Sequence, residues 1–167
     1  MPNCLCSSLL SKTDEQLERT SHLIPFIPDG RLSWTPGTAK AFPVGVLLGH
    51  LLECCSGFCA VLHAAKPAAL EHFIALKSER VNHDCTPSEA LKRIAGYASH
   101  IHHGFGHLVD ADLSISIPTV FVPAGELLLT LLLGNLEHLI NHKHQLFMYL
   151  QLMGAGVSSS DLYRFRS

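Results

Sequence analysis

Charged residues are scarce in this chain. Aspartate, glutamate, lysine and arginine make up 16% of its 167 residues, against about 25% in a typical soluble protein. So few charges cannot cover every outward-facing side of a domain of this length. We therefore expect part of the apolar surface to be covered by a second copy of the chain, in a homodimer.

The chain also lacks an excess of positive charge. Its 12 lysines and arginines stand against 14 aspartates and glutamates, which gives a formal net charge of −2. A protein that binds nucleic acid usually carries a basic patch or stripe. The composition therefore argues against a nucleic-acid partner.

Signals for export or membrane insertion are missing as well. The N-terminus has no basic region followed by a long apolar run, which a secretory leader requires. The longest apolar run that we identify, Leu127 to Leu133, contains Thr130 and is shorter than the roughly 18 residues of a spanning helix. Six cysteines would indicate disulfides only in a small secreted protein. We expect a reduced, cytoplasmic protein without a membrane partner.

Apolar residues recur with the period of a helix, and no strand-like alternation is evident. Proline, capping residues and glycine mark where helices start and stop. These signals predict four main helices, over 13–24, 43–66, 87–108 and 123–154. A long crossover, 67–85, joins the second to the third. The sequence thus predicts an all-α four-helix bundle forming a single domain, 1–167, with its core at about 13–154 and an irregular tail at 155–167.

Two histidines on the last helix point to a metal site. His138 and His142 are four residues apart, so both imidazoles lie on one face of the helix, about one turn apart. His50 faces the core side of the second helix and is the best candidate for a third ligand. Burying imidazoles without partners costs free energy, and this favours a divalent metal ion over simple packing as the reason for placing them there.

Other side chains near these histidines have open roles. Glu53, three residues after His50, is the candidate catalytic residue, either orienting a ligand or acting as a base. For Cys54, one turn after His50 on the same face, the sequence leaves three roles open: a fourth ligand, a substrate-side thiol or a small core residue. His100, His103 and His107 share the side of the third helix opposite its apolar stripe. We interpret this side as a solvated or subunit-facing surface, and the trio is the runner-up site if His50, His138 and His142 prove unfit as ligands.

The order of these features resembles the DinB/YfiT-like superfamily of metal-binding four-helix bundles, over about residues 13–163. The resemblance rests on a Trp-x-Pro loop at 34–36, on Gly45 to Leu51 and on Asp110 to Leu113. The most specific match is the long motif from His138 to Gly154, in which Lys143-His144 replaces the usual Arg-Gly. The family's metal ligands fall on His50, His138 and His142.

The resemblance implies a metal-dependent enzyme that acts on a small molecule, as a thiol S-transferase or a hydrolase-like protein. Its expected cofactor is a divalent ion (zinc, nickel or iron, with zinc first), and a low-molecular-weight thiol is the expected co-substrate. The alternative is a non-catalytic, stress- or damage-inducible protein that binds metal or a partner. An enzyme should leave one coordination position open, whereas a binding protein could close it with Cys54 or Glu53.

Overall fold

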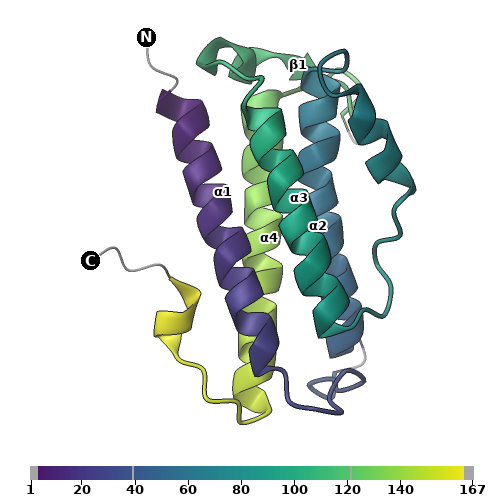
Figure 1. Ribbon diagram of the computed structural model, residues 1–167, viewed down its shortest axis with the longest axis vertical. Helices are drawn as coiled ribbons and strands as arrows, with labels where there is room; N and C mark the ends of the chain where they lie inside the picture. Colours follow the sequence, from purple (N-terminus) through teal and green to yellow (C-terminus); the bar gives the residue numbers. More distant parts are fainter. Residues whose placement is uncertain (1–3, 39, 121, 164–167) are drawn as a thin grey trace.

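The computed structural model describes residues 4–38, 40–120 and 122–163, and within them four long helices run roughly side by side (Figure 1). They are α1 (Cys4–Leu23), α2 (Val44–Ala65), α3 (Pro87–Phe105) and α4 (Leu128–Leu152). The chain runs along α2 and α3 in the same direction and along α1 and α4 in the opposite one. The predicted all-α four-helix bundle is confirmed.

The first helix begins nine residues before the expected start at Thr13. Leu5 N and Cys6 N donate to the carboxylate of Asp110, at 3.2 and 2.9 Å, so a residue more than a hundred positions away caps the helix. Thr13 is not a cap: its hydroxyl donates to the Leu9 carbonyl from within the helix. The local capping pattern was therefore misleading, because the true cap comes from the tertiary structure.

The third helix begins as predicted. Thr86 is its N-cap and accepts a hydrogen bond from Glu89 N, and Pro87 occupies the first turn. The Glu89 side chain does not complete a capping box, because its carboxylate lies 2.9 Å from His83 Nε2. The crossover before this helix contains a 3-10 helix, η2 (Glu71–Ser78).

The last helix begins at Leu128 rather than at Pro123. Short 3-10 and strand elements precede it: η3 (Asp110–Ser114), β1 (Ser116–Ile117) and β2 (Glu126–Leu127). The two strands pair antiparallel, and Gly125 turns into β2 with a positive φ of 95°. The turn and strand lie next to a leucine-rich segment, so the periodicity of apolar residues alone did not show that the helix begins only after them.

The last described segment of the chain lies beside α1, the first described helix (Figure 1). Within the tail, which was expected to be irregular, η4 (Ser159–Leu162) forms and buries Leu162. The Lys143 amine on α4 donates to the Leu162 carbonyl and to Gln16 Oε1. These buried bonds hold the tail against α1 and α4.

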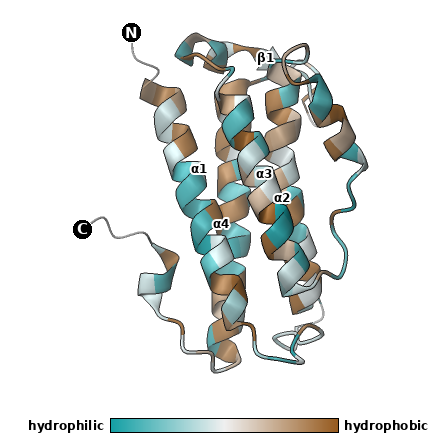
Figure 2. Cartoon of the chain, in the orientation of Figure 1, coloured by the Kyte–Doolittle hydropathy of each residue, from teal (hydrophilic) through white to brown (hydrophobic). Residues whose placement is uncertain are grey.

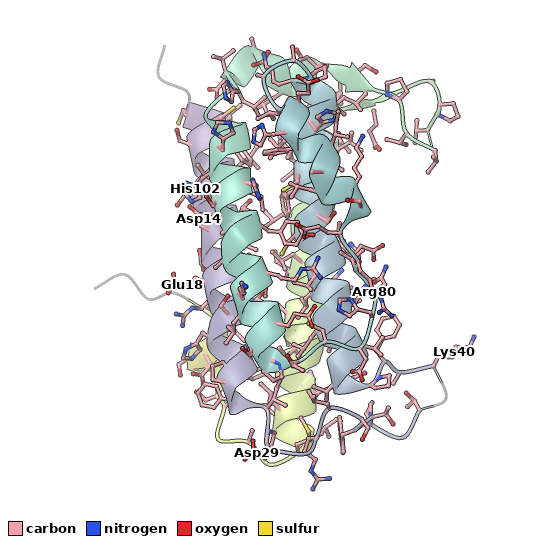
Figure 3. The ribbon with its side chains drawn as sticks, turned by 45° about the vertical axis from the view of Figure 1, so that its right-hand side comes forward. Asp14, Glu18, Asp29, Lys40, Arg80 and His102 are labelled. Carbon is pink, nitrogen blue, oxygen red and sulfur yellow. The ribbon has the colours of Figure 1, made fainter. Side chains whose placement is uncertain are left out.

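Hydrophobic and hydrophilic residues are mixed along α1 and α3, as expected for helices that pack on one side only (Figure 2). Figure 3 shows His102 and Asp14 facing each other between α3 and α1, with Nε2 and Oδ1 2.8 Å apart. By length and composition alone α2 could cross a membrane, but 61% of its most apolar window is buried inside the bundle. Polar residues interrupt the apolar run of this helix, so the sequence alone did not mark it as a candidate span.

Candidate metal centre

Three imidazoles from two helices converge near the loop that precedes α2. His138 and His142 stand one turn apart on α4, and His50 reaches them from the second turn of α2. His50 Nε2 lies 3.1 Å from His138 Nε2 and 3.0 Å from His142 Nε2. The three rings meet at steep angles, 69–89°, with their edges toward one another. The structure therefore brings together all three histidines expected from the sequence.

The far nitrogen of His50 faces two hydrogen-bond acceptors. Asn82 Oδ1 lies 2.6 Å and Glu53 Oε2 2.9 Å from His50 Nδ1. A carboxylate can only accept, so His50 Nδ1 carries the proton. In the neutral ring this leaves the lone pair on Nε2, directed at the other two histidines.

His142 is held in the same way. Its Nδ1 lies 2.8 Å from Gln145 Oε1, while the Gln145 amide nitrogen donates to the Tyr149 hydroxyl at 2.9 Å. This arrangement turns the amide oxygen toward the ring, so Nδ1 donates and Nε2 presents its lone pair. Metal-binding histidines typically have their outer nitrogen oriented by such a partner.

These hydrogen bonds place the lone pairs of His50 Nε2 and His142 Nε2 against each other, 3.0 Å apart. A proton on His138 Nε2 could satisfy the 3.1 Å contact with His50 Nε2 but would leave this opposition in place. A divalent cation bound to all three Nε2 atoms satisfies both contacts, so the donor set fits a metal ion. Burial lowers the pKa of His138 and of His142, and neighbouring imidazoles lower both further, which favours the neutral rings that bind metal.

The loop before α2 covers this end of the site. Phe42 packs against His50, with ring centroids 5.2 Å apart, and lies 6.4 Å from His142. Trp34 meets Tyr149 edge-on at 5.3 Å. The carbonyls of Leu32 and Trp34 accept from the first amides of α2, so the loop is fixed to the helix that carries His50.

Glu53 and Cys54 take different places from each other. Glu53 is 41% exposed and contacts the outer nitrogen of His50, which matches the orienting role. Cys54 is 1% exposed in the core, and burial, then the Glu53 charge, raises the pKa of its thiol to about 12. Among the described residues, the group of converging donor atoms consists of His50, His138 and His142 and includes neither Glu53 nor Cys54.

The runner-up trio on α3 does not form a comparable site. His103 and His107 lie with ring centroids 4.9 Å apart, and His72 lies 5.1 Å from His103. In the part of the chain that the structure describes, the donor atoms of His100, His103 and His107 do not all come within 4.8 Å of one another. His144 is exposed and lines a cavity of about 540 Å³ with Gln16, Lys143 and Tyr163.

Two contributors were not identified from the sequence. Gln145 offered a signal, because it follows His142 by three residues on the same helical face. Asn82 offered none: it lies 32 residues from His50 in the crossover, in a left-handed conformation with φ 56°. Only the path of the crossover along α2 brings it to the site.

Comparison with known proteins supports the fold. The chain is similar to the crystal structure of a DinB-like protein, YjoA from Bacillus subtilis, with a TM-score of 0.68 and 20% sequence identity. The similarity covers 95% of this chain and 96% of that chain. No protein-family model matches the chain, and no curated protein matches it. The likeness shows that the chain has a DinB-like fold, and its activity must be inferred from the site.

Proposed function

We propose that the chain is a metal-dependent enzyme that acts on a small molecule, as a thiol S-transferase or a hydrolase-like protein. His50, His138 and His142 are the metal ligands. The observation that carries the proposal is the convergence of three Nε2 atoms: those of His138 and His142 lie 3.1 and 3.0 Å from that of His50. The outer nitrogens of His50 and His142 each face a hydrogen-bond acceptor. Three protein ligands are the pattern of catalytic zinc sites, whereas structural sites use four.

When bound, such an ion keeps an open coordination position at which it can acidify a water or a thiol and polarise a carbonyl. Zinc is the first choice, with nickel and iron as alternatives, because imidazole suits all three. A low-molecular-weight thiol is the co-substrate we expect. Its thiolate would be the nucleophile that this class of transferase requires.

The remaining side chains position the ligands. Glu53 and Asn82 hold the His50 ring by accepting from Nδ1, and Gln145 does the same for His142. The part of Glu53 is thus to orient His50, and we do not assign it the role of base. Phe42 shields one side of His50 and His142 from water.

We further propose that the protein acts in the cytoplasm as a homodimer. Several large apolar side chains on or beside α4 are exposed: Leu127, Leu133, Ile140, Met148 and Leu152. A second copy would remove them from water. The molar mass in solution, measured by light scattering, should be twice that of the chain; a monomer at all concentrations would contradict this part of the proposal.

The test of activity begins with protein purified without an affinity tag and analysed for bound metal. The metal-loaded protein is then screened with small thiols and a panel of electrophiles and esters, beside a His138→Ala variant. We expect turnover that His138→Ala abolishes. Bound metal without turnover across the panel would favour the alternative, a non-catalytic metal-binding protein. No bound metal would contradict both metal-dependent roles and leave only the binding of a partner.

A further inference from the structure

A second group of metal-ligand side chains lies where the crossover enters α3. One donor atom each from His83, Cys85 and Glu89 lies within 4.8 Å of the other two. His83 Nε2 is 2.9 Å from Glu89 Oε1. The His83 side chain is 9% exposed and Cys85 is 1% exposed. A ring nitrogen, a thiol and a carboxylate oxygen thus meet in a position that is buried around His83 and Cys85 and opens to solvent at Glu89, whose side chain is 39% exposed.

The local sequence explains why these three groups meet. His83 and Cys85 are the third and the first residue before the N-cap Thr86, and Glu89 is in the first turn of α3. The cap and Pro87 fix the start of the helix, so the Glu89 side chain points back toward the end of the crossover. No chain closure over a long distance is needed to assemble the group.

Hydrogen bonding within the protein does not fully account for this group. Nε2 of His83 bonds Glu89, and the Cys85 thiol donates to the Thr86 carbonyl at 3.5 Å. Among the described residues, however, the buried Nδ1 of His83 has no hydrogen-bond partner, and such atoms in a native structure call for an explanation. Arg93 is near, with Nη1 3.6 Å from Glu89 Oε1, but its guanidinium also bonds Glu79 and the Arg80 carbonyl. A thiolate and a carboxylate carry two negative charges, which offset the repulsion between Arg93 and a divalent ion.

We propose that His83, Cys85 and Glu89 form a second metal site, for zinc or a similar divalent ion. The mixed nitrogen, sulfur and oxygen donors suit zinc, whereas magnesium and calcium take oxygen ligands. Binding forms a metal–sulfur bond and releases the thiol proton of Cys85 to solvent. The fourth ligand is water.

The position of this site gives it a role in shaping the histidine site. The crossover lies along the start of α2: Asn82 N donates to the Gly49 carbonyl at 3.1 Å and Cys85 N to the Gly45 carbonyl at 3.0 Å. Figure 3 shows Arg80 on this segment. Asn82, next to His83, is the residue that holds His50. An ion at the second site would anchor the crossover and thereby keep Asn82 against His50; only this coupling rests on the proposed function.

The two sites can be told apart with cobalt. Titration of the full-length, reduced protein with Co²⁺ gives a near-ultraviolet thiolate-to-cobalt charge-transfer band only where a cysteine is a ligand. The histidine site has nitrogen ligands alone. We expect the wild type to bind two ions per chain and to show the band, and His138→Ala to bind one ion and keep the band.

Variants of the second site should give the opposite result. Cys85→Ser should lose the band and keep one ion, while Cys59→Ser, at another buried cysteine, should keep it. Glu89→Gln should weaken cobalt binding at this site about tenfold or more, and it tests the site independently should Cys85→Ser fail to fold. Absence of the band from both wild type and His138→Ala, or its survival in Cys85→Ser, would overturn the proposal. Absence of metal from the histidine site alone would leave the band in place and count only against the proposed function.

Discussion

Removing one imidazole from the histidine site should abolish its metal-dependent stabilisation. The change is His138→Ala on α4, which deletes one of the two Nε2 atoms that face His50 Nε2. Ligands about 2.0–2.1 Å from a tetrahedral zinc ion stand about 3.3 Å apart. The observed separations of 3.0 and 3.1 Å from His50 therefore need to widen by only a few tenths of an ångström.

The expected magnitude follows from linkage. At a free zinc concentration a thousand times Kd, binding stabilises the folded chain by about 4 kcal/mol. For a chain of this size that corresponds to a rise in Tm of about 8–16 °C. Part of this stabilisation arises because the bound ion removes the opposition between lone pairs at the Nε2 atoms. With one ligand missing we expect the part of the shift that the histidine site contributes to fall to a few degrees or less, while the site proposed at His83, Cys85 and Glu89 would keep its own contribution.

The assay is thermal unfolding of apo protein at a series of buffered zinc concentrations. His144→Ala is the matched control, since His144 is an exposed histidine on the same helix and is absent from the converging donor atoms. It should keep the full shift. The reasoning is refuted if wild type shows no zinc-dependent shift, or if His138→Ala shifts as far as His144→Ala does.

Three further perturbations test how the bundle is held together. Backbone amides of Cys6 and Leu5 lower the pKa of the Asp110 carboxyl. The stabilisation that the carboxylate provides is therefore complete above its unfolded pKa of about 3.9 and is lost as the pH falls through the lower folded pKa. Asp110→Asn should lower Tm at neutral pH and flatten the decline of Tm between pH 5 and 2. Gly49→Ala places a Cβ against the backbone of His83 and should reduce both Tm and zinc affinity. The control Gly134→Ala, whose Cβ would meet nothing nearby, should stabilise the protein by about 0.5–1 kcal/mol in urea unfolding. Equal effects of the two variants would contradict the close packing of the crossover against α2. Thr86→Ala removes the α3 cap and should cost about 1 kcal/mol, measured by urea unfolding, and an unchanged midpoint would show that the cap is dispensable.

The sequence was least informative where distant segments supply a local need. Thr13 looked like a helix start, but Asp110 provides the actual cap of α1 nine residues earlier. The start of α4 was predicted five residues too early, because the turn at Gly125 and the pairing of β1 with β2 interrupt an apolar segment that reads as continuous helix. Helix periodicity carries no information about such long-range partners.

The sequence by itself determined the four helices and which three histidines come together. The period of 3.6 residues puts His138 and His142 on one face, and the apolar face of the second helix turns His50 inward. These are local properties of a helix, which a single sequence can express. The orientation of the rings was decided only by the tertiary structure. Asn82 reaches His50 because the crossover packs where α2 has Gly45 and Gly49, and contacts between segments so far apart in the chain have no local pattern in the sequence.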